Sequence, residues 1–157
     1  MSRIVVGVDG SDESRHALAW AVQEARLREA DLEVVYAYEY TPAWQLYGYE
    51  GVSAAQMDAL AAEDEVAQQE AHDRAEELLK GMVAELGDAG SIEVTTTAIT
   101  DRRPAAALVG RAEGADMLVV GSRGRGGFSG LLLGSVSQQV ATHAACPVVI
   151  ITRPETD

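Results

Sequence analysis

The sequence has almost no cysteine, almost no lysine and no long apolar run. Its 157 residues include one cysteine, Cys146, which excludes an internal disulfide framework and a zinc site built from several cysteines. No apolar run approaches the roughly 20 residues that a membrane-spanning helix needs, and the apolar residues 4–8 are too few for a signal peptide. We therefore expect a cytoplasmic protein that does not enter a membrane.

Basic residues are also scarce, because 12 of them face 25 acidic ones and the formal net charge is −13. Extended contact with nucleic acid or with an anionic membrane surface needs a basic footprint, so we expect neither partner. Residues 50–88 hold eleven acidic and two basic residues, whereas residues 99–130 hold five arginines against three acidic residues. The acidic stretch is most simply a solvated helix face, although it also suits the docking of a partner.

What is present is an ordinary globular composition, with 47% hydrophobic and 24% charged residues. This composition excludes intrinsic disorder as the main state, and the length suits one domain with its own core. We predict a single domain over residues 1–153, followed by a short tail over residues 154–157.

Short apolar runs alternate with stretches of helical periodicity along the chain. The predicted strands are residues 3–8, 32–38, 91–99, 116–120 and 147–152, and the predicted helices are residues 11–30, 54–86, 104–114 and 135–145. This alternation predicts an α/β fold, in which helices cover both faces of a mainly parallel sheet. A continuous helix over residues 54–86 would be about 50 Å long, so its first turns should either bend or project from the domain.

A glycine-rich stretch from Val120 to Ser135 follows a predicted strand and precedes a predicted helix, as phosphate-binding loops do. Glycine lets backbone N–H groups approach an anion, the helix start supplies more of them, and Arg123 and Arg125 add positive charge. The stretch is not a Walker A loop, since the chain's one lysine lies elsewhere, and it does not fit the dinucleotide fingerprint. An alternative without a ligand also fits, in which Ser135 and Gln138 form a capping box and the glycines only shape a turn.

The order of the strands decides what lies beside this stretch. If the strand order is 3-2-1-4-5, the winding reverses between the first and fourth strands, whose ends carry Asp9 and Gly121. Ligands bind at such a reversal in open parallel sheets. Asp9 would there orient a magnesium ion or hydrogen-bond the ligand, although a lone aspartate in such a turn is more commonly a helix cap.

The pattern Gly121-x2-Gly124-x9-Gly134-Ser135 resembles the nucleotide-binding signature of the universal stress protein family. Residues 4–11 and 143–151 resemble the same family, so the resemblance extends over nearly the whole chain. It implies a Rossmann-like five-stranded α/β fold, a homodimer and the ATP-binding branch of the family. One departure is the segment 100–104, where many members have a glycine and where Arg102 or Arg103 could supplement a phosphate site.

The resemblance also implies the residues around the nucleotide. They are Gly7, Val8, Asp9, Ala37, Val120, Gly121, Arg123, Gly124, Arg125, Gly134, Ser135 and Val136. Asp9 would face ribose, phosphates or Mg²⁺, while Ala37 and Val120 would face the adenine. Gly121 and Gly124 would hold the ribose and the first phosphates. The outer phosphates would meet the backbone N–H groups of residues 134–136 and the hydroxyl of Ser135.

Together these features favour an ATP-binding regulatory protein of the stress response, in which the nucleotide changes the loops at residues 39–54 and 122–134. One alternative is a slow ATPase or phosphotransfer enzyme. Asp9 is the one obvious candidate base for it, but a carboxylate can hold a metal ion without driving hydrolysis, so no catalytic residue is assigned. Another is a dimeric adaptor that does not use nucleotide.

Residues 148–152 form an apolar strand at a predicted sheet edge, which either pairs in a homodimer or is covered in a monomer.

Aromatic residues are few, and six of the eight lie between Tyr36 and Tyr49. This cluster either forms a lid over the nucleotide or a partner surface, or it packs on the sheet edge and the base of the long helix. The second interpretation is the simpler one, since amphipathic aromatic rings commonly cover the margins of a core.

Overall fold

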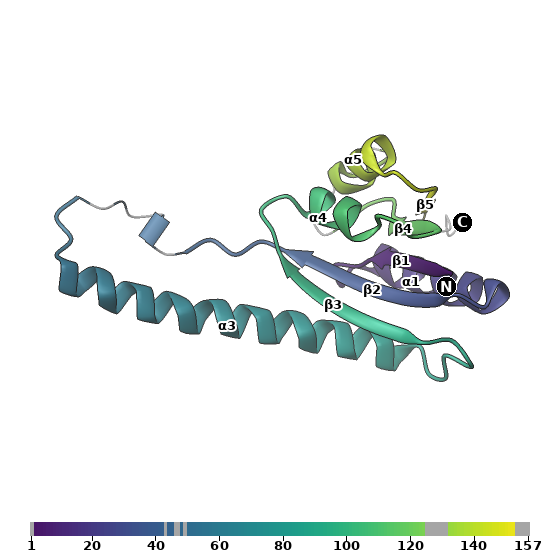
Figure 1. Cartoon of the computed structure of the whole chain (residues 1–157), viewed down its shortest axis with the longest axis horizontal. Helices are drawn as coiled ribbons and strands as arrows, with labels where there is room; N and C mark the ends of the chain where they lie inside the picture. The colour runs from purple at the N-terminus through teal and green to yellow at the C-terminus, as the bar shows by residue number, and fades with distance from the viewer. Residues whose placement is uncertain (1, 43, 46–47, 49, 125–131, 153–157) are drawn as a thin grey trace.

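The computed structural model describes residues 2–42, 44, 45, 48, 50–124 and 132–152. Strands and helices alternate along them (Figure 1). The elements are β1 (Arg3–Gly7), α1 (Asp12–Arg28), β2 (Asp31–Tyr38), α3 (Ala54–Glu85), β3 (Val94–Thr100), α4 (Pro104–Arg111), β4 (Met117–Gly121), α5 (Ser135–His143) and β5 (Val148–Ile151). The predicted succession of elements is therefore confirmed, although β3 begins three residues late because Gly87 and Gly90 turn the chain with positive φ.

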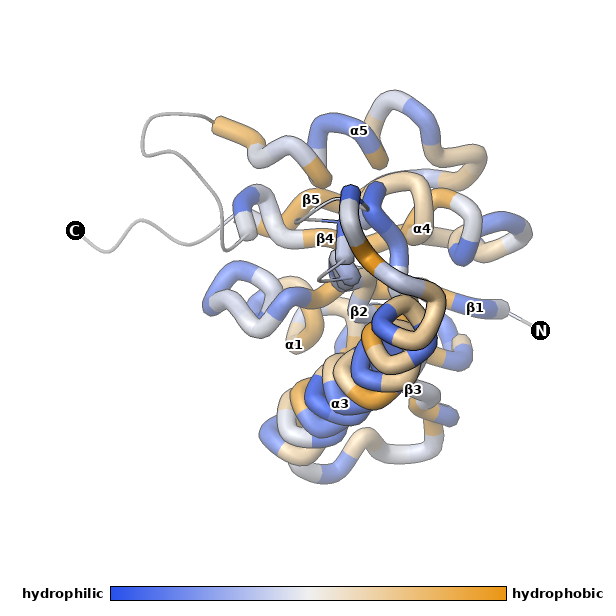
Figure 2. Tube along the Cα trace, turned by 90° about the vertical axis from the view of Figure 1, so that its left-hand side faces the viewer, coloured by the Kyte–Doolittle hydropathy of each residue, from blue (hydrophilic) through white to orange (hydrophobic). Residues whose placement is uncertain are grey.

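The five strands form one sheet in the order β3-β2-β1-β4-β5, and every neighbouring pair is parallel. This confirms the predicted order 3-2-1-4-5 and the Rossmann-like α/β fold. Helices α1 and α3 pack on one face of the sheet, and α4 and α5 pack on the other (Figure 2). The winding reverses between β1 and β4, so the ends of these two strands lie side by side.

The central strand β1 is buried on both faces, as its unbroken apolar run predicts. Ile4 and Val6 join the core under α1 and α3, whereas Val5 joins the core under α4 and α5, and all three are fully buried. This placement leaves the two residues that follow β1, Val8 and Asp9, at the edge where ligands bind in such sheets.

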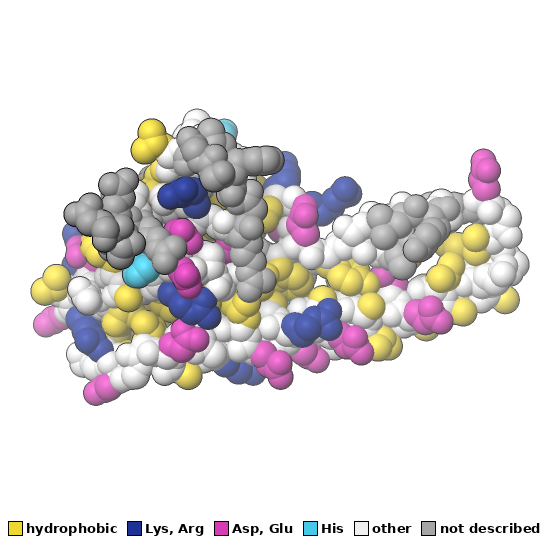
Figure 3. Space-filling view, turned by 180° about the vertical axis from the view of Figure 1, so that it is seen from behind, with side chains coloured by type: hydrophobic (Ala, Val, Ile, Leu, Met, Phe, Trp, Pro, Cys, Tyr) yellow, Lys and Arg dark blue, Asp and Glu magenta, His cyan; other side chains and the backbone are white. Residues whose placement is uncertain are grey.

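The acidic stretch is the helix α3, which runs without a break over 32 residues and is therefore about 48 Å long. Its second half packs on the sheet through Ala75, Leu79 and Met82, while its first half projects past the sheet (Figure 1). The helix starts at a capping box between Ser53 and Gln56. The sequence predicted that the first turns of this helix either bend or project from the domain, and in the structure they project. Acidic side chains line it in the space-filling view (Figure 3).

Tyrosines join β2 to α3, as the simpler interpretation of the aromatic cluster expects. The Tyr38 hydroxyl accepts a hydrogen bond from Thr100 Oγ1 (2.8 Å) and lies 3.0 Å from His72 Nδ1. The Tyr40 hydroxyl donates to the Asp64 carboxylate at 2.7 Å. Tyr47 and Tyr49 lie outside the described residues, so the lid and partner-surface interpretations stay predictions.

A charged group, Glu33, is buried in the middle of β2 and is only 4% exposed. Its carboxylate accepts hydrogen bonds from Arg3 (2.8 Å), Arg111 (2.5 Å) and Thr97 (2.8 Å). Burial by itself raises the pKa of Glu33, but the hydrogen bonds from Thr97 and Arg111 outweigh it and hold this pKa below its usual value. The ionised carboxylate thus ties β1, β3 and α4 to β2.

Candidate functional site

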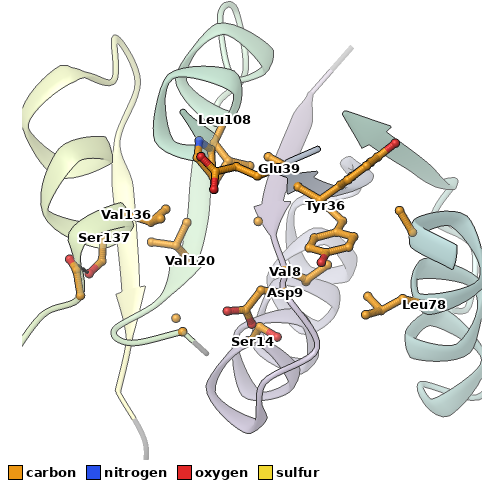
Figure 4. Close-up of a pocket in the computed structure, with 18 of the residues that line it drawn as sticks. Val8, Asp9, Ser14, Tyr36, Glu39, Leu78, Leu108, Val120, Val136 and Ser137 are labelled. Carbon is orange, nitrogen blue, oxygen red and sulfur yellow. Dashed lines mark hydrogen bonds between the residues drawn. The ribbon is translucent and has the colours of Figure 1, made fainter. Parts of the chain in front are cut away.

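A cavity of about 810 Å³ opens at the carboxyl ends of β1, β2 and β4 (Figure 4). Its size lies within the range of about 300–1,000 Å³ that is usual for small-molecule sites. The predicted site residues that line it are Gly7, Val8, Asp9, Ala37, Val120, Gly121, Arg123, Gly124, Gly134, Ser135 and Val136. Arg125 lies outside the described residues. The structure therefore brings together eleven of the twelve predicted residues in one cavity at the reversal of the sheet.

Asp9 is held by the first turn of α1. Its Oδ1 accepts hydrogen bonds from the backbone N–H and the hydroxyl of Ser11, at 2.9 and 2.5 Å. Ser11 in turn is the N-cap of α1, as its sequence position predicts, since its hydroxyl accepts from the Ser14 N–H. The aspartate carboxylate is thereby fixed at the floor of the cavity, close to Val8 and Ser14 (Figure 4).

Helix α5 begins at Ser135, as predicted, but Ser135 is not the N-cap that the alternative without a ligand requires. Gly134 occupies that position with extended backbone angles and with no side-chain cap. The reason is a backbone bond across the glycine segment, in which the Gly134 N–H donates to the Ser122 carbonyl at 2.7 Å. The Gln138 N–H then closes the first helical turn on Gly134. The capping box of that alternative is therefore wrong, and Ser135 and Val136, the first residues of α5, line the cavity.

The four glycines that line the cavity differ in whether packing within the protein requires them. A Cβ at Gly7 would lie 2.8 Å from Leu108 Cδ1, and one at Gly121 would lie 3.1 Å from the Glu13 backbone. A Cβ at Gly124 would overlap the carboxylate of Asp9. Packing within the protein explains these three. At Gly134 the nearest atoms would be at an ordinary 3.5 Å, so protein packing does not by itself demand glycine there.

Side chains of both charge signs face the cavity. Arg123 lines it beside the glycine segment, and Arg74 lines it from α3, while Asp9 and Glu39 contribute carboxylates. Arg74 lies 3.9 Å from Glu70 in an exposed pair. Arg102 is exposed and neither it nor Arg103 lines the cavity, so the predicted supplement to the phosphate site is not brought to it.

Sequence reasoning missed other residues of the lining, and all of them except Glu39 lie on helices or on β2. These residues are Ser14, Tyr36, Tyr38, Glu39, Ala71, Arg74, Ala75, Leu78, Pro104, Leu108 and Ser137. The helical stripe of α3 predicts that Ala71, Ala75 and Leu78 face the sheet. It does not predict that they reach the strand ends, since this depends on how far α3 projects.

Among the described residues, no group of three or more histidine, cysteine or acidic side chains is arranged to hold a metal ion. Asp9 therefore belongs to no such cluster in the part of the chain that the structure describes. In the described part of the chain, no helix has the length and apolar character needed to cross a membrane.

Comparisons of this chain with known proteins all indicate the same family. The family profile for the universal stress protein family matches residues 1–152. A universal stress protein of Mycobacterium tuberculosis is 34% identical over 147 residues, which are 94% of this chain and 44% of that protein. One from Thermus aquaticus is 34% identical over 150 residues, which are 94% of this chain and 96% of that protein.

A solved structure supports the same likeness. A universal stress protein crystallised in complex with cAMP is 28% identical, with a TM-score of 0.62, and the match covers 96% of this chain and 95% of that one. The mycobacterial relatives are longer proteins, and this chain spans about 44% of the length of those it matches first. Their activities as whole proteins therefore do not transfer to this chain directly.

Proposed function

The chain belongs to the universal stress protein family, and we propose that it is a regulatory protein that binds ATP with Mg²⁺ in the cavity at the ends of β1 and β4. In this proposal, nucleotide occupancy is a signal in a cytoplasmic stress response. The observation that carries the proposal is the open start of α5, which faces the same cavity as Asp9, Arg123 and Gly124.

The glycine segment suits phosphates. The first N–H groups of α5 have no intrahelical acceptor, and the helix dipole places partial positive charge at the same end. Gly134 is the position at which protein packing leaves room for a side chain, so an approaching phosphate gives a reason for glycine there. Arg123 adds a formal positive charge at this end.

The opposite walls of the cavity suit a nucleobase. Val120 and Val136 lie on one side and Val8 on the other, with Leu108 nearby (Figure 4). Such apolar walls with a few polar groups are typical of small-molecule sites. The relative crystallised with cAMP supports adenine as the base, because cAMP carries that base. In this arrangement Ala37 and Val120 contact the adenine.

Asp9 fits the role of a magnesium ligand. Mg²⁺ in nucleotide sites is commonly held by one or two carboxylates together with phosphate oxygens. Ser11 already orients the Asp9 carboxylate, which reduces the entropy lost on binding. The metal would screen the repulsion between this carboxylate and the phosphates.

The net charge of −13 does not oppose this proposal. The acidic side chains of α3 lie mostly on its exposed surface, and Glu76 and Lys80 form an exposed pair along it. A compact triphosphate responds to the groups around the cavity rather than to the average charge, since exposed charges more than about 10 Å away are screened at 0.1 M salt.

The proposal includes a homodimer through β5. This strand, Val148–Ile151, lies at the edge of the sheet, is apolar and is partly exposed along its whole length. Pairing of two such edges about a two-fold axis would bury both. Light scattering coupled to gel filtration tests this, and a Val149→Lys variant is expected to be monomeric.

The proposal is tested by calorimetry with Mg-ATP and a pair of charge-reversal variants. Arg123→Glu changes a residue of the cavity, and Lys80→Glu makes the same change of charge on the exposed surface of α3. We expect Arg123→Glu to weaken binding by about tenfold or more, because hydrogen bonds to charged groups contribute about 1.5–3 kcal/mol. Lys80→Glu should change it by less than about twofold.

The alternatives predict other outcomes. If the protein binds none of Mg-ATP, AMP and cAMP, the proposal fails and the nucleotide-independent adaptor is the remaining alternative. Phosphate release that disappears in Asp9→Ala identifies an ATPase, whereas slow release that survives this substitution is not chemistry of the site. Identification of the small molecule released on denaturing freshly purified protein shows which nucleotide the cavity holds.

A further inference from the structure

The backbone of Ser122 connects three parts of the fold at the start of the glycine-rich stretch. Its N–H donates to the carbonyl of Ile151 in β5 at 2.8 Å, which continues the pairing of β4 with β5. Its carbonyl accepts from the Gly134 N–H at 2.7 Å. The backbone of Ser122 is therefore bonded to β5 through its N–H and to the N-cap of α5 through its carbonyl.

Ser137 makes a second connection to the same carbonyl. It lies in the first turn of α5, is only 2% exposed, and places its Oγ 2.8 Å from the Ser122 oxygen and 2.9 Å from the Gly134 oxygen. A serine hydroxyl has one proton, which is shared here between the two carbonyls. One buried hydroxyl therefore joins the end of β4 to the N-cap of α5.

The comparison with Ser14 shows what is unusual in this arrangement. Ser14 is also buried in the first turn of its helix, and its hydroxyl donates to the carbonyl three residues earlier at 2.9 Å. This bond stays within one turn of α1. Ser137 makes the equivalent bond to Gly134 and adds the bond to Ser122, which lies fifteen residues earlier in the chain.

We propose that Ser137 is a positioning residue of the anion site. This inference rests on the proposed function. Ser122 and Gly134 lie near the two ends of the glycine-rich stretch. The N–H groups that would meet phosphate belong to residues next to Gly134. Binding of this kind requires donors held within about 0.5 Å of their positions. The hydroxyl of Ser137 holds the start of α5 against the residue that follows β4.

The inference is tested with Ser137→Ala. The fold should persist, because the Ser122 oxygen keeps the Gly134 N–H and the Gly134 oxygen keeps the Gln138 N–H, so neither carbonyl is left without a partner. The control is Thr142→Ala, which removes a hydroxyl that donates to the carbonyl of Gln138 in the same helix, on its exposed side. Thermal unfolding measures the stability of both variants.

Two readouts distinguish positioning from general support of the fold. Calorimetry compares Mg-ATP with adenosine, which has no phosphate to meet the start of α5. We expect Ser137→Ala to weaken ATP about fivefold to tenfold, which corresponds to one hydrogen bond, and to leave adenosine and the Thr142→Ala variant within about twofold. Amide exchange by NMR on the nucleotide-free protein should show faster exchange of the Gly134 N–H in Ser137→Ala alone.

Each result of these two measurements either supports or overturns the positioning role of Ser137. Equal losses of ATP and adenosine affinity, or no loss of either, overturn the positioning role of Ser137. Unchanged exchange at Gly134 overturns it as well, and this measurement needs no ligand. If the wild-type protein binds neither compound, the proposed function fails and the positioning role fails with it, while faster exchange at Gly134 in Ser137→Ala would still identify the connection within the fold.

Discussion

Replacing Gly124 with alanine should cost both stability and nucleotide affinity, because the added methyl group would occupy the space of the Asp9 carboxylate. Gly124 is not among the glycines with positive φ, so alanine suits its backbone and the cost arises from the clash alone. Relief of the clash requires Asp9 to move away from the loop after β4. This movement disturbs the two hydrogen bonds by which Ser11 holds Oδ1, at 2.9 and 2.5 Å.

The structure gives the size of the effect. A hydrogen bond to a charged group contributes about 1.5–3 kcal/mol, and a displaced carboxylate regains part of this from water, so we expect a loss of about 2 kcal/mol. For a domain of this size that is a fall of roughly 4–8 °C in the unfolding temperature. If the proposed function holds, the affinity for Mg-ATP should fall as well, since the displaced Asp9 would no longer face the proposed Mg²⁺ site.

A double-mutant cycle with Asp9→Ala checks this reasoning by calorimetric unfolding. Once the carboxylate is absent, alanine at position 124 meets no oxygen, so Gly124→Ala should cost less than about 0.5 kcal/mol in that background. An equal cost of Gly124→Ala with and without the Asp9 carboxylate would refute the clash as the cause.

Three further variants test other parts of the structure. Glu33→Gln should lower stability by about 2–4 kcal/mol at pH 7. Because the folded pKa of Glu33 is below its usual value, the wild-type advantage exists above about pH 4.5 and shrinks as the pH falls through the folded pKa. Urea unfolding of both proteins at pH 7 and pH 3 measures this difference. Tyr38→Phe should cost about 1–2 kcal/mol through the lost contacts with His72 and Thr100, and hydrogen exchange should be faster in the second half of α3. Gly81→Ala should raise stability by about 0.5–1 kcal/mol, because a Cβ there meets nothing within 4 Å in an exposed turn of α3; a lower unfolding temperature would contradict this.

Local patterns in the sequence predict most of the elements, because each depends on residues close together in the chain. The unbroken apolar run of β1 and the helical stripe of α3 are examples. The N-cap Ser11 is confirmed for the same reason, since its acceptor and donor lie three residues apart. The start of α5 at Ser135 is confirmed, but the alternative capping box is wrong because the N-cap involves a distant group. The N-cap is Gly134, whose N–H donates to the Ser122 carbonyl.

The sequence by itself thus determined the α/β fold, the strand succession and the glycine segment that marks the cavity. Only the tertiary structure decided what each glycine contacts. Asp9 and Gly124 are far apart in the chain and meet because β1 and β4 are neighbours in the sheet. The same holds for Arg74 and Leu78, which line the cavity because α3 packs on β2 and β3. Contacts of this kind follow from the order of the strands and the packing of the helices, which no local pattern contains.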